Sequence, residues 1–166
     1  MKKFFLILSA LFLISILSFS ATTNKAKVGI QKGNEAPNIK ITDLNGKTVN
    51  LTDYRGKTVL LNFWATWCPP CRAEMPSLEE VWVKNKKDIT ILAVSIDEDS
   101  TANVKKFIKD GKYTFPVFHD KKGDTVNTYL IKNIPTTYII DKDGIIIDKI
   151  VGGIDWTKYQ FPKAGK

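Results

Sequence analysis

The two cysteines of the 166-residue chain, Cys68 and Cys71, are separated by two prolines. A Cys-x-x-Cys pair can cycle between a dithiol and a disulfide, and the thiolate is the reactive form. The pair follows the apolar run 58–64 and precedes a stretch with helical spacing, so a buried strand ends and a helix begins there. The positive end of a helix dipole stabilises a thiolate at such a position. The sequence therefore favours thiol–disulfide exchange.

The two sulfurs are not expected to be equivalent. Cys71 shares helical spacing with Met75, Leu78 and Trp82, which places it on the apolar face of the helix. Cys68 precedes the first turn, and we expect it to be exposed. Cys68 is therefore assigned as the attacking nucleophile and Cys71 as the buried resolving thiol.

The first turns of this helix hold further candidate residues. Pro69 and Pro70 are tolerated because the first N–H groups of a helix have no partner within it, and they leave fewer N–H groups to contact sulfur. Glu74 follows Cys71 by three residues, on an adjoining surface of the helix. It is either a carboxylate within reach of the Cys71 sulfur or a solvated surface side chain. Pro76 predicts a kink.

The N-terminus has the features of an export signal. Lys2 and Lys3 precede the uncharged apolar run 4–19, and small residues near its end fit cleavage after Ser20. This run is shorter than a transmembrane helix, which needs about 20 apolar residues to span a bilayer. We therefore expect residues 1–20 to be a signal peptide, with an uncleaved anchor as the alternative. The protein would be periplasmic, or tethered to the membrane and facing away from the cytoplasm.

Composition limits the remaining function classes. A hydrophobic fraction of 43% and a charged fraction of 25% are typical of one folded domain rather than a disordered chain. The net charge of +8 comes from lysines spread along the chain, so we expect no nucleic-acid partner. Two cysteines and one histidine cannot complete an ordinary zinc site, and we expect no metal.

Local patterns predict the elements that position the cysteine pair. Alternation around an Asn-Gly turn predicts a hairpin from residues 39–42 and 48–51. Further strands are predicted at 58–64, 89–96, 116–118, 136–140 and 145–151, and helices at 69–84, 101–109 and 124–131. This order predicts an α/β fold with a mixed central β-sheet flanked by helices. The chain would divide into a signal peptide (1–20), a linker (21–32), one domain (33–152) and a short C-terminal tail (153–166).

Together these motifs resemble the thioredoxin family. The matching features are a Trp-Cys-x-x-Cys motif after a buried strand, Pro76 five residues beyond the second cysteine, and Ile134-Pro135-Thr136 near the last strands. The resemblance is sharpest to the extracytoplasmic TlpA/ResA/CcmG group. That group adds an exported N-terminus, an N-terminal hairpin, a strand ending in Asn-Phe-Trp-Ala-Thr-Trp-Cys, and a helix–strand insert. The resemblance covers roughly residues 32–152 and implies a thioredoxin fold with these additions.

The resemblance also implies roles for single residues. Asn62 stands where cytoplasmic thioredoxin has a buried aspartate, and Glu74 stands where the group carries its active-site glutamate. Pro135 would form a cis peptide bond and lie against the two sulfurs. Ile134 would offer backbone groups to the substrate chain.

The implied activity is exchange with other proteins. The chain would reduce disulfides of exported proteins with cysteine pairs, such as apocytochrome c, and would receive electrons from a membrane donor. We expect it to be a monomer without a cofactor. Trp67, Pro69 and Pro70 lie beside the nucleophile and would form part of the substrate-binding surface. One departure is that 15 residues, 152–166, follow the last strand, so the family's C-terminal helix is reduced to about 155–160.

Three other functions are alternatives. A thiol oxidase would use the same pair in the opposite direction. A peroxidase is suggested by residues 33–37 and 45–47, which resemble peroxiredoxin N-termini, although Trp64 and Cys68 stand where the motif Pro-x-x-x-Thr-x-x-Cys requires proline and threonine. A copper-binding module would require Cys-x-x-x-Cys and a histidine, whereas two residues separate these cysteines and a structural role is favoured for His119.

Overall fold

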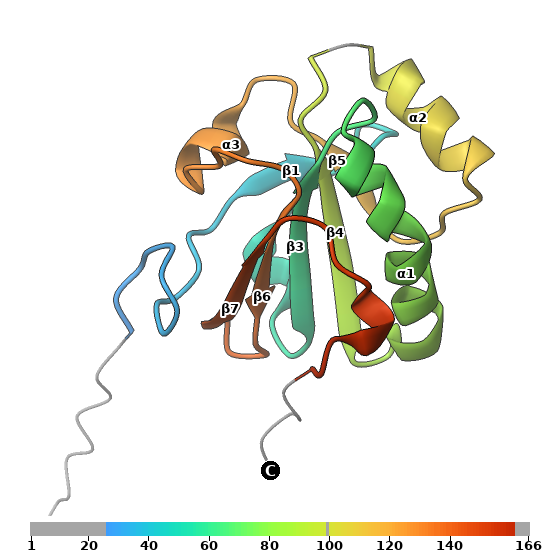
Figure 1. Cartoon of the computed structure of the whole chain (residues 1–166). Coiled ribbons are helices and arrows are strands. Elements are labelled where there is room, and N and C mark those ends of the chain that lie inside the picture. The colour runs from blue at the N-terminus through green and yellow to red at the C-terminus, as the bar shows by residue number, and fades with distance from the viewer. Residues whose placement is uncertain (1–25, 99, 162–166) are drawn as a thin grey trace, which may run out of the picture.

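The structure is a computed structural model that describes residues 26–98 and 100–161 (Figure 1). Its centre is a five-stranded sheet with the strand order β5-β4-β3-β6-β7. The strands are β3 (Thr58–Trp64), β4 (Ile89–Ser95), β5 (Val117–His119), β6 (Thr136–Ile140) and β7 (Ile146–Val151). β3, β4 and β5 are parallel, whereas β6 and β7 are antiparallel to their neighbours. The predicted mixed sheet is confirmed.

The remaining elements surround this sheet. They are the hairpin strands β1 (Lys40–Thr42) and β2 (Thr48–Asn50), the helices α1 (Pro69–Asn85), α2 (Thr101–Asp110) and α3 (Asp124–Thr128), and the 3-10 helices η1 (Leu51–Tyr54) and η2 (Trp156–Lys158). The hairpin turn contains Gly46 at φ +90°, a backbone conformation that favours glycine. The chain thus has the helix-flanked α/β fold that the sequence predicts, with the α1 N-terminus directly after β3.

Alternation along β3 separates two apolar cores. Leu60 and Trp64 pack with the buried face of α1, together with Trp156 from η2. Leu61 and Phe63 point to the opposite face and pack in a second cluster, with residues of the N-terminal hairpin. Because successive strand residues face opposite sides, β3 directs the side chain of residue 62 toward the α1 face.

The short helix α3 ends earlier than predicted. The spacing of residues 124–131 predicts a helix to residue 131, but α3 ends at Thr128. Leu130 has φ +49°, and the Ile131 N–H donates to the Val126 carbonyl at 3.0 Å. This hydrogen bond closes the helix end in the manner of a Schellman motif. Glycine usually occupies the position that Leu130 holds here, so no residue in the sequence indicated that the helix ends early.

The chain before the hairpin is held against the sheet. The Gly33 N–H donates to the Ile146 carbonyl at 2.8 Å, and the Ala36 N–H donates to the Gly144 carbonyl at 2.9 Å. Inside the predicted linker, the Lys27 carbonyl accepts from the Glu35 N–H at 3.0 Å. The boundary at residue 33 stays a prediction. The predicted signal peptide lies outside the described residues. No helix within 26–98 and 100–161 has both the length and the apolar character needed to cross a membrane.

Candidate active site

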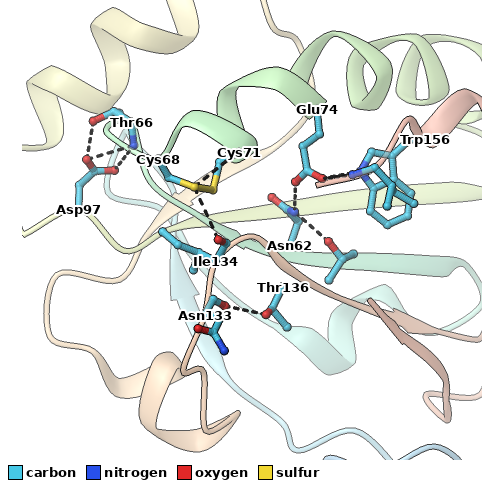
Figure 2. Close-up of a disulfide and its surroundings, with 12 residues drawn as sticks. Asn62, Thr66, Cys68, Cys71, Glu74, Asp97, Asn133, Ile134, Thr136 and Trp156 are labelled. Atoms are coloured by element: carbon cyan, nitrogen blue, oxygen red, sulfur yellow. Dashed lines mark hydrogen bonds between the residues drawn. A yellow bond between two sulfur atoms is a disulfide. The ribbon is translucent and has the colours of Figure 1, made fainter. Parts of the chain in front are cut away.

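Cys68 and Cys71 form a disulfide at the start of α1 (Figure 2). Cys68 is the N-cap residue of the helix, and Pro69 and Pro70 occupy its first two positions. Since proline has no N–H group, Cys71 supplies the first backbone donor of the helix. That N–H donates to the Cys68 sulfur at 3.3 Å. The two prolines therefore leave one backbone donor in this turn, and it is directed at the predicted nucleophile.

The prediction that Cys68 is exposed is wrong for this disulfide state. Its exposed fraction is 3%, and that of Cys71 is 0%. The Ile134 carbonyl oxygen lies 3.7 Å from the Cys68 sulfur. This contact is not a hydrogen bond, because a disulfide sulfur carries no proton. The Ile134–Pro135 peptide bond is cis, as the resemblance implied. A loop distant in sequence therefore covers the sulfur, which the helix pattern alone could not indicate.

The predicted substrate-binding residues surround the disulfide to different degrees. Trp67 is 63% exposed, an unusual fraction for an indole, and Pro69 and Pro70 are exposed beside it. Ile134 is half-buried and Pro135 is buried. The structure thus places an apolar surface next to the sulfurs, and its role in docking stays a prediction.

Glu74 is buried, with an exposed fraction of 2%, which excludes the solvated surface alternative. One carboxylate oxygen accepts from Asn62 Nδ2 at 2.9 Å. The other accepts from Trp156 Nε1 at 3.1 Å and from the Ile154 N–H at 3.4 Å (Figure 2). Burial raises the pKa of Glu74 from 4.5 to about 7, and the hydrogen bonds from Asn62, Trp156 and Ile154 oppose that rise. Glu74 can therefore accept and release a proton near neutral pH.

Asn62 links this carboxylate to the sheet. Its Nδ2 also donates to Thr137 Oγ1 on β6 at 2.9 Å, so both amide hydrogens have partners. Its Oδ1 has no hydrogen-bond partner in the described part of the chain. The cluster joins β3, β6, α1 and the C-terminal segment. Sequence reasoning identified Asn62 and Glu74 but missed Thr137 and Trp156, which no local motif marks.

A second buried carboxylate was also missed. Asp97 is 1% exposed and accepts from Ser95 Oγ at 2.6 Å. It also accepts from Thr66 Oγ1 at 2.5 Å and from the Thr66 N–H at 3.1 Å. The Asp97 carbonyl accepts from His119 Nε2 at 2.7 Å, and His119 Nδ1 lies 2.9 Å from Thr101 Oγ1. Asp97 therefore fastens the turn before Cys68, and His119 has a structural place behind it.

The chain is similar to several known proteins. Residues 32–149 match the model of the AhpC/TSA family. A thiol-disulfide oxidoreductase ResA of Bacillus cereus is 44% identical over 127 residues, which are 76% of this chain and 73% of that protein. The thioredoxin-like protein YneN of Bacillus subtilis (strain 168) is 40% identical over 152 residues, 87% of this chain and 89% of that one. The solved exposed lipoprotein thioredoxin of Streptococcus pneumoniae (strain TIGR4) has a TM-score of 0.65 and 32% identity, over 73% of this chain and 93% of that chain.

Proposed function

The chain belongs to the AhpC/TSA family and is a thiol–disulfide oxidoreductase, and from that premise we propose that it reduces disulfides of other exported proteins. The observation that carries the proposal is the Cys71 N–H directed at the Cys68 sulfur, at the N-terminus of α1. A donor and a helix dipole both stabilise a thiolate there. Cys68 is therefore the attacking thiol once the pair is reduced.

The reaction proceeds through a mixed disulfide. The Cys68 thiolate attacks one sulfur of the substrate disulfide, and the other substrate sulfur leaves as a thiolate. The Cys71 thiolate then attacks the Cys68 sulfur and releases the second substrate thiolate. Two electrons pass to the substrate, and the protein is left with the Cys68–Cys71 disulfide seen in the structure. A membrane donor of two electrons returns it to the dithiol.

Glu74 takes part in the second step. Cys71 is fully buried, and burial favours the protonated thiol over the thiolate. Glu74 follows Cys71 by one helical turn, and its pKa of about 7 suits a group that takes the thiol proton and later returns it. We assign this general base role to Glu74.

Export is supported by the N-terminal pattern, in which Lys2 and Lys3 precede an apolar run that ends in small residues. The thioredoxin from Streptococcus pneumoniae, a protein of similar fold, is an exposed lipoprotein by its own description. Substrates would be exported proteins with cysteine pairs, of which apocytochrome c is one candidate. Exposed Trp67 offers an apolar contact to such a chain.

The peroxidase alternative has no support at the cysteine pair. A peroxiredoxin site requires Pro-x-x-x-Thr-x-x-Cys, and this chain has Trp64 and Cys68 at the proline and threonine positions. Cys68 is instead tied to Cys71 in a disulfide. Net oxidation uses the same pair, so a direct test must separate the two directions.

Trapping provides that test. A Cys71→Ser variant, expressed at native level with its N-terminus intact, should accumulate mixed disulfides between Cys68 and substrate proteins. The matched control Cys68→Ser should trap almost nothing, because its remaining thiol, Cys71, is fully buried and lies beyond the helix N-terminus that stabilises a thiolate at residue 68. If the parent protein is a reductant, its deletion should leave the trapped proteins more oxidised. More reduced substrates would instead identify an oxidase, and equal trapping by both variants would contradict the assignment of Cys68 as nucleophile.

A further inference from the structure

We propose that Trp156 is a positioning residue for Glu74, and that its indole N–H sets the pH range in which Glu74 serves the cysteine pair. The inference rests on the proposed role of Glu74. It adds the C-terminal segment, residues 153–159, to the site. The resemblance to thioredoxins implies only a shortened C-terminal helix for this segment and gives it no role at the site.

The first argument is the origin of the hydrogen bonds to Glu74. Of the three N–H groups that reach the carboxylate, two come from the C-terminal segment, from Ile154 and Trp156. Both donate to the same carboxylate oxygen, Oε2, while Asn62 donates to Oε1. The shorter of the two bonds from the segment is that of Trp156, at 3.1 Å. The indole N–H is therefore the main hydrogen-bond donor to Glu74 Oε2.

The second argument is that the segment is anchored without the indole N–H. The Trp156 backbone N–H donates to Ser77 Oγ on α1 at 3.1 Å. The Tyr159 hydroxyl donates to Asp148 Oδ2 on β7 at 2.8 Å. The Trp156 ring is fully buried and packs 5.6 Å from the Tyr159 ring, between ring centroids. Removal of the N–H alone should therefore leave the ring and the segment in place.

The third argument is the contact of the segment with the first turn of α1. A Cβ atom added to Gly153 would lie 2.8 Å from the Pro70 carbonyl oxygen, closer than such atoms approach in proteins. The Gly153 backbone thus lies directly against the cysteine motif. A groove bordered by Pro70, Glu74, Ser77 and Ile154 opens there.

The fourth argument is that neutral N–H donors, rather than positive charges, stabilise the Glu74 anion. On α1, Glu80 borders the same groove as Glu74, and on the C-terminal segment Asp155 borders it too, while Tyr159 packs against the indole of Trp156. β3 and β6 contribute only neutral Asn62 and Thr137. Among the ion pairs of residues 26–98 and 100–161, none includes Glu74. Neutral donors therefore carry the stabilisation of the anion, and loss of one raises the pKa of Glu74 further.

The experiment uses the oxidised protein, in which no thiol titrates. Glutamate carboxyl carbons are followed by ¹³C NMR between pH 4 and 9, and Glu74→Gln identifies the Glu74 signal by its absence. In Trp156→Phe the Glu74 midpoint should move upward by about one pH unit, as expected for one lost hydrogen bond to a charged group. In the reduced protein, the pH profile of thiol–disulfide exchange should move in the same direction.

Trp64→Phe is the matched control. Trp64 is also fully buried, and its Nε1 has no hydrogen-bond partner in the described part of the chain. Its replacement removes a buried indole that donates no hydrogen bond to Glu74, so the Glu74 midpoint should stay where it is in the parent. A shift in Trp64→Phe as large as that in Trp156→Phe would overturn the proposal, since it would then reflect general loosening.

A second variant keeps the proposal testable if Trp156→Phe fails to fold. Gly153→Ala must push the segment away from Pro70, so the N–H groups of Ile154 and Trp156 should both withdraw and the midpoint should rise at least as far. A folded variant of either kind that titrates like the parent overturns the proposal. If the midpoint moves but Glu74→Gln exchanges at the parent's rate, the proposed function of Glu74 is wrong, while its positioning by Trp156 stands.

Discussion

Two buried carboxylates lie on opposite sides of the disulfide, and they are held in different ways (Figure 2). Asp97, on the Cys68 side, accepts two short hydroxyl hydrogen bonds, at 2.5 Å from Thr66 and 2.6 Å from Ser95. Glu74, on the Cys71 side, accepts only N–H groups, at 2.9 to 3.4 Å. Both are almost without exposure.

The two sets of hydrogen-bond partners have different consequences. Hydrogen bonds from hydroxyl groups to carboxylates are short and strong, and those at Asp97 fasten the turn that carries Trp67 and Cys68. At Glu74 the longer N–H bonds do not offset burial, so the pKa of Glu74 rises to about 7. The same kind of group therefore anchors the nucleophile on one side and exchanges protons on the other. Four predictions test this division.

The largest effect should be on pH-dependent stability. The folded protein binds the Glu74 proton more tightly than the unfolded chain, because the pKa of Glu74 is raised from 4.5 to about 7. Its contribution is complete below pH 4.5 and is lost as the pH rises to about 7, a cost of about 3 kcal/mol. Urea unfolding should show that Glu74→Gln gains this amount relative to the parent between about pH 4.5 and 8. A difference that does not depend on pH would mean that Glu74 titrates normally.

The next effect should be on the rate of resolution. Without a carboxylate to take the Cys71 proton, Glu74→Gln should release a bound substrate thiol roughly 100-fold more slowly, as for loss of a general base. The same variant should have at least one lower cysteine pKa, since a negative charge is removed nearby. Rapid-quench kinetics on a preformed mixed disulfide with Cys68 measures the rate. Asp97→Asn is the matched control and should stay within a few-fold of the parent.

The third effect belongs to Asp97. Asp97→Asn replaces a carboxylate oxygen by an amide that cannot accept all the donors of Thr66 and Ser95. We expect a loss of about 2 kcal/mol in the free energy of unfolding. Urea unfolding measures this loss. A variant as stable as the parent would show that Asp97 does not hold the turn before Cys68.

The strand and helix on either side of the cysteine pair could be predicted, because the residues that mark them are close together in the sequence. Two prolines, an apolar face and a preceding apolar run place the start of α1 at Pro69 and the end of β3 at Trp64. The helix pattern could not indicate the burial of Cys68, because Ile134, which contacts its sulfur, lies 66 residues further along the chain, and only the family resemblance placed that loop against the sulfurs. The Glu74 partner Trp156 is 82 residues away, and nothing in its neighbourhood marks it. Tertiary contacts of that kind leave no periodic pattern in one sequence.

The two carboxylates, Glu74 and Asp97, also differ in how readily the sequence identifies them. Glu74 was a candidate because it follows Cys71 by three residues on one helix and matches a family position, whereas helical spacing alone left a solvated surface carboxylate as the alternative. Asp97 follows a different strand, β4, and approaches Thr66 only because β3 and β4 are parallel neighbours in register. Adjacent parallel strands end at the same edge of a sheet, which could have suggested Asp97 once that pairing was assumed.

The smallest effect should be on the reactivity of the two thiols, and it tests whether the anchored side carries the nucleophile. In the reduced protein the Cys71 N–H and the helix N-terminus favour the Cys68 thiolate, whereas Cys71 is fully buried and faces the core. Iodoacetamide at mildly acidic pH should therefore alkylate Cys68 about tenfold faster than Cys71, the ratio that one unit of pKa difference would give. Peptide mass spectrometry measures both rates in one sample. In Asp97→Asn the ratio should fall, because the turn before Cys68 is loosened. Preferential alkylation of Cys71 in the parent would reverse the roles of the two sulfurs and place the nucleophile beside the titrating carboxylate.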